Sequence, residues 1–152
     1  MTPKDAAKQC LEEGSVMQLG TLHDGQPRVN SVYYVPSDDY RSWYWMSEPR
    51  RRHSIDMKAN PNAGGAIVTK ADSPVIGLQF YGIASEVYDV NEIEHIADKY
   101  NQKYDNVAAG FAQRYKNGTN KHLFDKLVIT NLEIFDQENH GGEPVEAVAP
   151  AE

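Results

Sequence analysis

Short runs of β-branched and aromatic residues, separated by turn-forming residues, dominate the pattern of the chain. The first two runs, 15–22 and 28–35, flank the pair Asp24-Gly25. An Asp-Gly pair between two such runs is typical of a tight hairpin, because both turn residues adopt positive φ. Four further runs predict strands at residues 41–47, 63–70, 75–88 and 123–135. The pattern therefore predicts six strands joined mainly by tight turns.

Helix signals stand at the start of the chain and at two insertions between strands. Thr2-Pro3 offers an N-cap followed by a proline at the first helical position, and predicts a short amphipathic helix that Gly14 ends. The other predicted helical segments are residues 48–60, 90–104 and 107–115. Short strands with few helical insertions favour a mainly β fold, a small antiparallel barrel flanked by helices, over an alternating βα fold.

Length and composition fit one domain. The chain has 152 residues, of which 40% are hydrophobic and 24% are charged, as in ordinary globular proteins. We assign residues 1–136 to the barrel and expect residues 137–152 to form a flexible acidic tail, because their glycines, prolines and small residues leave little to bury. No apolar run is long enough to span a membrane and no signal-peptide pattern is visible, so the expected location is the cytoplasm.

The net charge of −7 is unevenly distributed. Residues 136–152 hold five acidic residues and no Lys or Arg, which leaves −2 on the rest of the chain. An acidic protein is not expected to bind the nucleic-acid backbone. The dense cationic cluster is Arg-Arg-Arg-His at residues 50–53, directly after the third predicted strand and at the start of a predicted helix.

This cluster combines groups that bind phosphate. Ser47 supplies a hydroxyl, Arg51 and Arg52 supply guanidinium groups, and a helix N-terminus supplies free N–H groups and a favourable dipole. Two other interpretations stay open from the residues alone. The arginines could form a solvated basic face, or they could pair with the acidic tail.

Arg28 is a second candidate for an anion. Side chains alternate along a strand, so Arg28 is expected to share a face with Asn30 and Val32. The residues expected on the opposite face are Val29, Ser31 and Tyr33. From its strand Arg28 can reach a ligand phosphate, and an edge-strand arginine in solvent is the alternative.

Other chemistries lack a signature in the sequence. The histidines have no ligand-like spacing to one another or to Cys10, so we expect no metal site. Cys10 has no basic neighbour and is expected to pack as a small residue. No dinucleotide fingerprint, P-loop or Ser/His/Asp signature is present. The strand aromatics, such as Trp43 and Tyr33, are expected mostly in the core, although some could line a pocket.

A succession of short motifs gives a more specific indication. The motifs are residues 18–22, 26–29, 45–47, Arg52-His53, Asn60-Pro61, 77–82 and Glu86-Val87. In this order and spacing they resemble the pyridoxamine 5'-phosphate oxidase-like FMN-binding split barrels, over about residues 10–135. The Arg-His pair and the strand Gly-x-Gln-Phe-x-Gly are similar to a small uncharacterised branch of that family. The resemblance implies a six-stranded split barrel and a homodimer with two FMN sites at the subunit interface.

The resemblance also implies which residues contact the cofactor. By position they are Arg28, Val29, Asn30, Met46, Ser47, Arg51, Arg52, His53 and Gln79. The family's phosphate grip falls on the arginines and His53, and a strand glutamine of some members corresponds to Gln79. Where the oxidases have a lysine this chain has His53, a phosphate partner whose charge depends on pH.

The function implied is that of an FMN-dependent oxidoreductase acting on a small molecule, with no catalytic residue assigned because the flavin carries the hydride chemistry. The oxidases end in a basic element that holds the phosphorylated vitamin, whereas residues 136–152 have no cation, so oxidation of pyridoxamine phosphate is not expected. Two alternatives stay open. The protein could hold a flavin, a deazaflavin or haem without catalysis, or it could be a cofactor-free interaction domain whose arginines dock an acidic partner.

Overall fold

The computed structural model describes residues 1–148 and forms the hairpin predicted at Asp24-Gly25. Its strands are β1 (Val16–His23) and β2 (Gln26–Tyr33), paired antiparallel along their whole length. Asp24 and Gly25 have φ of 49° and 79°, as a two-residue turn requires. The burial pattern of β2 alternates as predicted, and this strand ends two residues earlier than the sequence indicates.

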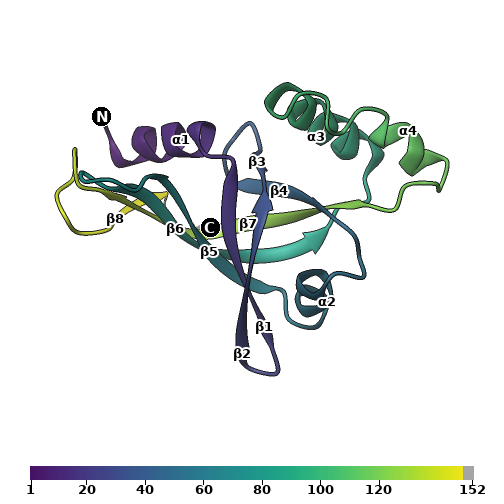
Figure 1. The fold of residues 1–152 in the computed structure, drawn as a ribbon, viewed down its shortest axis with the longest axis horizontal. Coiled ribbons are helices and arrows are strands. Elements are labelled where there is room, and N and C mark those ends of the chain that lie inside the picture. The colour runs from purple at the N-terminus through teal and green to yellow at the C-terminus, as the bar shows by residue number, and fades with distance from the viewer. Residues whose placement is uncertain (149–152) are drawn as a thin grey trace.

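The strands form one curled antiparallel sheet (Figure 1). The remaining strands are β3 (Val35–Pro36), β4 (Ser42–Ser47), β5 (Asn62–Lys70), β6 (Ile76–Glu86), β7 (Leu123–Asp136) and β8 (Val145–Val148). Their order is β2-β1-β5-β6-β7-β4-β3, and β8 pairs with the second half of β7. The mainly β, split-barrel fold class is confirmed, with eight strands in the described residues rather than six.

Two local features account for the additional strands. Tyr34 interrupts the second predicted strand: its N–H donates to the carbonyl of Ser15 and its buried hydroxyl donates to the carbonyl of Leu11, so the chain leaves β1 and continues as β3 beside β4. The second feature is β8, where Ala147 is buried in the core. Residues 145–148 thus differ from the expected flexible tail, and residues 149–152 lie outside the described residues.

Four helices flank the sheet in the described part of the chain. They are α1 (Pro3–Glu13), α2 (Arg52–Ala59), α3 (Val90–Lys103) and α4 (Phe111–Lys116). The predicted helix 48–60 begins later, because the N–H of Arg51 closes a turn on the carbonyl of Glu48. The segment predicted from residue 107 also begins later, at Phe111, since Gly110 lies within it and has a φ of 73°. No helix within residues 1–148 has the length and apolar character needed to cross a membrane.

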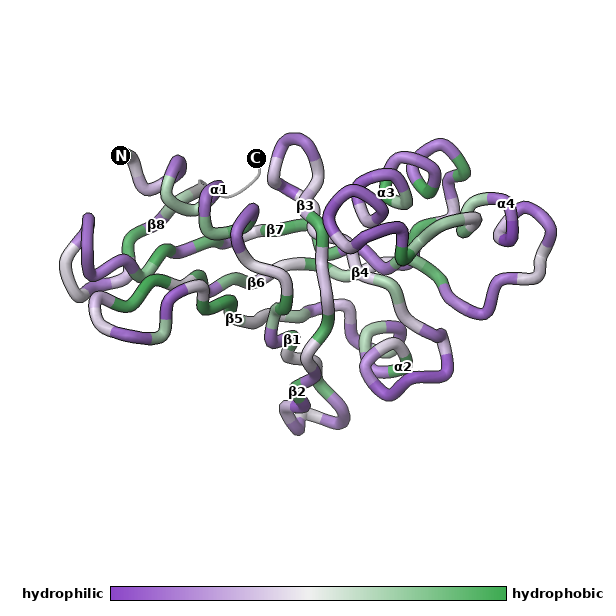
Figure 2. The backbone as a smooth tube through the Cα atoms, turned by 45° about the horizontal axis from the view of Figure 1, so that its top comes forward, coloured by the Kyte–Doolittle hydropathy of each residue, from purple (hydrophilic) through white to green (hydrophobic). Residues whose placement is uncertain are grey.

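The core consists of two hydrophobic clusters that meet at β4. Trp43 and Trp45 point into a cluster shared by α1 and the curled sheet, whereas Tyr44 points into a cluster shared with α3 and α4. In Figure 2 hydrophobic stretches lie along parts of the strands, and the outward turns of the helices are largely hydrophilic. Because β4 is covered on both faces, its C-terminal end at Ser47 has a fixed position beneath the helices.

Candidate functional site

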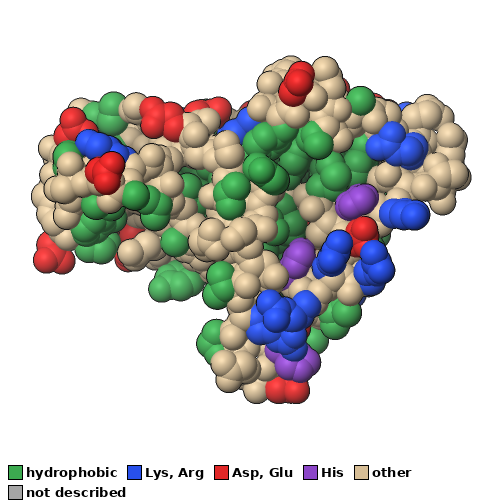
Figure 3. All heavy atoms as spheres, in the orientation of Figure 1, with side chains coloured by type: hydrophobic (Ala, Val, Ile, Leu, Met, Phe, Trp, Pro, Cys, Tyr) green, Lys and Arg blue, Asp and Glu red, His purple; other side chains and the backbone are tan. Residues whose placement is uncertain are grey.

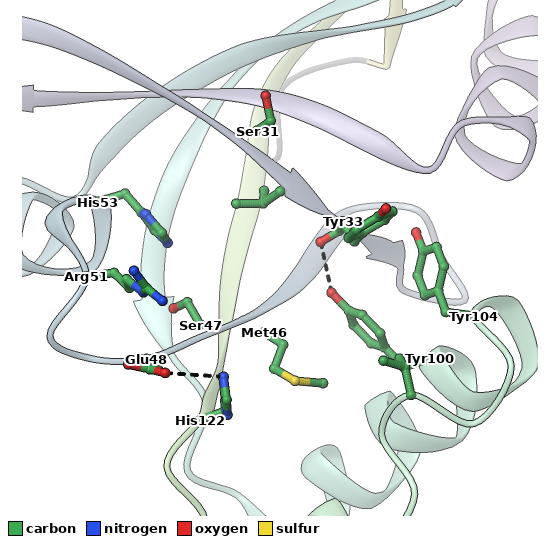
Figure 4. Close-up of a pocket in the computed structure, with 12 residues that line it drawn as sticks. Ser31, Tyr33, Met46, Ser47, Glu48, Arg51, His53, Tyr100, Tyr104 and His122 are labelled. Carbon is green, nitrogen blue, oxygen red and sulfur yellow. Dashed lines mark hydrogen bonds and ion pairs between the residues drawn. The ribbon is translucent and has the colours of Figure 1, made fainter.

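A pocket of about 650 Å³ opens where β2, the end of β4, the start of α2 and α3 come together (Figure 4). Its lining residues are Ser31, Val32, Tyr33, Met46, Ser47, Glu48, Arg51, His53, Tyr100, Tyr104, Val107 and His122. In the space-filling view basic and histidine side chains gather over α2 and the hairpin, and hydrophobic side chains fill the hollow between them and α3 (Figure 3). The pocket is thus polar and basic on one side and aromatic on the other.

Ser47, Arg51 and His53 form the basic end of the pocket, where their polar groups point toward one another (Figure 4). The His53 side chain is 8% exposed, and its Nε2 is buried without a hydrogen-bond partner among residues 1–148. Burial, together with the charges of Arg51 and Arg52, lowers the pKa of His53. The imidazole is therefore neutral at pH 7, and Arg51 provides the fixed positive charge of this end.

The N-terminus of α2 adds unpaired donors to the basic end. Arg51 is the N-cap residue, with extended backbone, and its side chain makes no capping hydrogen bond. The first N–H groups of a helix have no partner within the helix and carry the positive end of its dipole. At α2 no N-cap side chain occupies these groups, which leaves them free for an anion.

Ser47 connects the basic end to a buried carboxyl. Its hydroxyl donates to Oδ2 of Asp125 on β7 at 2.6 Å and lies 2.9 Å from the hydroxyl of Ser54 on α2. Asp125 is 5% exposed, and burial raises its pKa to about 6; the charge of Glu86 acts in the same direction. Asp125 thus carries a group that titrates close to neutral pH directly behind the pocket.

Glu48 places a negative charge at the edge of the same end. It pairs with Arg50, and its Oε1 lies 3.8 Å from Nε2 of His122, the residue just before β7. The hydrogen bond from Arg50 lowers the pKa of Glu48. The carboxylate is therefore ionised at neutral pH and lies between the guanidinium group of Arg50 and the ring of His122.

Tyr33, Tyr100 and Tyr104 form the tyrosine end of the pocket, opposite the basic end (Figure 4). The rings of Tyr33 and Tyr104 meet edge to face at 5.4 Å, and those of Tyr100 and Tyr104 are 5.3 Å apart. The hydroxyl of Tyr100 donates to the carbonyl of Tyr33 at 2.9 Å. Burial raises the pKa of Tyr104 to about 12, so its hydroxyl keeps its proton. This end presents rigid aromatic surface of the kind that contacts planar rings.

Arg28 is directed to a buried carboxylate rather than to the pocket. Its Nε lies 3.5 Å from Oδ2 of Asp56, which also accepts a hydrogen bond from the hydroxyl of Thr21 at 3.1 Å. Nδ1 of His23 lies 3.3 Å from the other carboxylate oxygen. Since Asp56 is on α2 and its partners are on β1 and β2, this cluster fastens the hairpin to the helix.

The remaining candidates lie around the pocket or away from it. Arg52 reaches Asn30 on β2, with Nη2 3.5 Å from Oδ1. Val29 and Gln79 are exposed on strands β2 and β6 and do not line the pocket. Of the nine residues that the resemblance implies, the pocket therefore brings together Met46, Ser47, Arg51 and His53.

Several lining residues were not indicated by the sequence. The lining residues Tyr100, Tyr104 and His122, and the buried Asp125 behind the pocket, lie far along the chain from the cluster at residues 50–53, so local motifs do not connect them. The spacing of Tyr100 and Tyr104, four residues apart on an amphipathic helix, does predict that these two rings share a face. Among residues 1–148 no three His, Cys, Asp or Glu side chains come together in a cluster that could hold a metal ion.

Comparison with known proteins gives the same fold. Residues 3–137 match the family model of pyridoxamine 5'-phosphate oxidase. No curated protein matches the chain. Three similar solved structures have names that state different ligands or none.

The first is the haem storage protein HutZ from Vibrio cholerae, with a TM-score of 0.69 and 17% identity over 90% of this chain and 95% of that one. An FAD-binding protein from Mesorhizobium loti has a TM-score of 0.65 and 21% identity over 84% and 89% of the two chains. A conserved hypothetical protein from Mycobacterium tuberculosis has a TM-score of 0.77 and 15% identity over 99% and 94%. At these identities the similarity shows the fold alone.

Proposed function

The chain belongs to the pyridoxamine 5'-phosphate oxidase family, and on that premise we propose that its pocket binds FMN and that the protein is a flavin-dependent oxidoreductase of a small molecule. The observation that carries this proposal is the Nε2 of His53, buried in the pocket without a partner beside Arg51 and Ser47. A buried polar atom without a partner is costly, and a phosphate oxygen would satisfy it.

The residues of the basic end fit a phosphate group. Arg51 offers a fixed positive charge and several N–H donors, and the first turn of α2 offers backbone donors. Neutral His53 can donate from Nε2 in the tautomer that carries its proton on this nitrogen. The neighbouring arginines are engaged elsewhere, Arg50 with Glu48 and Arg52 with Asn30, which favours a built anion site over a uniform basic docking face.

The tyrosine end fits the planar ring of the same cofactor. A pocket of about 650 Å³ is within the usual size for cofactor sites. A bound flavin supplies hydride transfer, and the chain's own residues bind and orient it and exclude water. The described part of the C-terminal segment, residues 137–148, has acidic residues but no Lys or Arg. This supports a substrate other than the phosphorylated vitamin.

Replacing Arg51 tests the proposal. We expect Arg51→Ala to weaken FMN binding by about 10- to 100-fold, because a hydrogen bond to a charged group is lost. The measurement is a titration of the apo protein with FMN, followed by flavin fluorescence. Arg41→Ala, which removes an exposed arginine away from the pocket, is the matched control and should bind like the wild type. Unchanged affinity of Arg51→Ala would contradict the assignment.

Haem binding is a second candidate, favoured by the presence of two histidines, His53 and His122, in one pocket. A histidine nitrogen is a common axial ligand of haem iron, and one structural neighbour is named as a haem storage protein. Absorption spectra of the protein titrated with FMN, a deazaflavin and haemin separate these cofactors. A Soret band that His122→Ala abolishes, without saturable flavin binding, would favour haem.

We also propose that the protein is a homodimer with its pockets beside the interface. Val29, Val68, Tyr81 and Ile83 are exposed on one side of the sheet, and we call this surface the apolar face. It is continuous along β2 with Ser31 and Tyr33 of the pocket, because these side chains alternate to the same side as Val29. Exposed apolar groups gathered in this way are typical of a subunit interface.

A further inference from the structure

Ser47 separates the main pocket from a second cavity. On its other side a cavity of about 330 Å³ is lined in part by Ser54, Lys58, Glu86 and Asp125. The hydroxyl of Ser47 connects the two spaces. It donates to Asp125 at 2.6 Å and lies 2.9 Å from the hydroxyl of Ser54. The protonation state of Asp125 therefore acts on the hydroxyl that the pocket presents.

A serine hydroxyl has one hydrogen and two lone pairs. When Asp125 is ionised it can only accept, so the Ser47 hydrogen is directed to the carboxylate and Ser47 offers only lone pairs to the pocket. When the Asp125 carboxyl is neutral it can donate to Ser47, and the Ser47 hydrogen is then free to turn to Ser54 or to an anion held in the pocket beside Arg51 and His53. An oxyanion in the basic end needs donors, and it is repelled by a carboxylate behind the serine.

We propose that Asp125 is a positioning residue that decides, through Ser47, whether the basic end binds a phosphate or similar oxyanion, with the neutral carboxyl as the binding form. This inference rests on the phosphate site of the proposed function. It adds a residue of β7 that touches no ligand, and it predicts that anion binding is accompanied by uptake of a proton at Asp125.

The surroundings of Asp125 support a proton that exchanges near neutral pH. The groups facing it are Ser47 from β4, Ser54 and Lys58 from α2, Glu86 from β6, and Tyr88 just after β6, whose hydroxyl donates to Glu86. Lys58 lowers the pKa of Asp125, but its Nζ lies 3.2 Å from Glu86 and is shared with that carboxylate. Burial outweighs the hydrogen bond from Ser47, and the pKa is raised to about 6. Across Ser47 the charged and titratable groups at the basic end of the pocket are Glu48, Arg51, His53 and His122.

Sulfate is the suitable probe, because its charge is constant from about pH 5 to about pH 8 whereas a phosphate monoester titrates in this range. Binding is followed by the NMR shifts of the amides of Arg51 and His53 in the wild type and in Asp125→Asn. The asparagine can donate to Ser47 at every pH, as the neutral carboxyl does. Asp72→Asn, in the exposed turn before β6, removes the same charge far from the pocket and is the control.

We expect wild-type affinity for sulfate to fall about tenfold between about pH 5 and about pH 8, the effect of one charged hydrogen bond. Asp125→Asn should keep the higher affinity across the range, and Asp72→Asn should follow the wild type. His53 also gains a proton at low pH, so His53→Gln is measured in parallel and should retain the part of the slope due to Asp125.

Three outcomes would overturn the inference: an unchanged pH profile in Asp125→Asn, a wild-type affinity independent of pH, or no sulfate binding at any pH. Ser47→Ala tests the same coupling from the other side and should also lose the slope that depends on Asp125. If Asp125→Asn does not fold, this second variant decides. Sulfate binding with the expected slope but no FMN binding would support the inference and refute the proposed cofactor. FMN binding, together with a pH profile of sulfate affinity that Asp125→Asn does not change, would support the proposed cofactor and refute the inference.

Discussion

Asp125 is a carboxyl group that the fold removes from water and supports with one short hydrogen bond from Ser47. Its pKa is raised from an ordinary 3.8 to about 6 in the folded protein. Between these two values the folded state binds more protons than the unfolded state, so stability falls as pH rises through this window. The contribution of the protonated group is complete below about pH 4 and is lost above about pH 6.

Asp125→Asn should therefore stabilise the protein at neutral pH. We expect the free energy of unfolding to rise by about 2 kcal/mol at pH 7, and this gain to shrink to within about 0.5 kcal/mol near pH 4, where Asp125 is protonated as well. Urea unfolding at both pH values measures the difference. An equal gain at both pH values would mean that packing, rather than ionisation, causes the difference in stability between aspartate and asparagine at position 125.

Asp56 is also a buried carboxyl group, but three side chains of the hairpin contact it. Arg28, Thr21 and His23 all reach it from the hairpin. We expect Asp56→Ala to lower the free energy of unfolding by about 3 kcal/mol, because Arg28 loses its partner and the hairpin loses its link to α2. Denaturant unfolding measures this loss. Asp98→Ala, at an exposed position of α3, is the control and should change stability by less than about 0.5 kcal/mol.

At the scale of the element, α2 begins in a way that favours binding over stability. An N-cap usually carries Ser, Thr, Asp or Asn, but α2 has Arg51 there without a capping hydrogen bond. The first-turn donors remain available at the pocket as a result. Without a capping side chain, the first turn of α2 is less stable than that of a helix with Ser, Thr, Asp or Asn at the N-cap.

Arg51→Ser should separate the two effects. The serine can cap the first turn, so we expect the free energy of unfolding to rise by about 1 kcal/mol, while FMN affinity falls as in Arg51→Ala. Thermal unfolding and the fluorescence titration measure the two quantities. Arg51→Ala cannot cap and should lose affinity without gaining stability. Equal stability of both variants would show that the backbone donors are already satisfied.

The elements differ in how far the sequence determines them. The hairpin at Asp24-Gly25 and the alternation along β2 follow from local chemistry, and both were predicted. The division of the second strand at Tyr34 depends on Leu11, and the burial of Ala147 depends on the sheet it meets, so neither is visible locally.

The site shows the same limit. The neighbouring residues Met46, Ser47, Arg51 and His53 were predicted together and line one pocket. Arg28 was expected to face a phosphate. Its position in a strand predicts the face on which its side chain lies but not the group that it contacts, and in the structure that group is Asp56 on α2. Asp125 could not be anticipated, since only the pairing of β7 with β4 brings it to Ser47.

At the scale of the whole molecule, the apolar face includes two glycines, Gly20 and Gly64, which leave a part of the sheet without side chains. Val29, Gly20, Gly64 and Tyr81 are paired in a row across four strands. A Cβ at Gly64 would lie 2.9 Å from the ring of Tyr81, so the glycine lets this ring lie flat against the strand. The groove over the glycines, flanked by Tyr81 and Ile83, is the surface we expect a second copy to cover.

Tyr81→Lys should therefore convert the proposed dimer to a monomer. Tyr81 is 64% exposed, and a lysine ammonium buried against the partner would have no counter-charge there. Size-exclusion chromatography with light scattering gives the mass. Tyr88→Lys, at an equally exposed tyrosine outside the apolar face, should leave the mass unchanged. A wild-type monomer, or a dimer that persists in Tyr81→Lys, would place the interface elsewhere or exclude it.

The two hydrophobic clusters that meet at β4 also bear on how this protein could diverge. The tyrosine end is carried largely by α3, whose packing belongs to one cluster, whereas Ser47, Arg51 and His53 depend on β4 and α2. Substitutions at pocket-facing positions of α3 that leave its packing against Tyr44 of β4 intact can thus change the tyrosine end without moving Ser47. Over evolutionary time the tyrosine end can therefore change the molecule that it binds, while the basic end keeps its anion site.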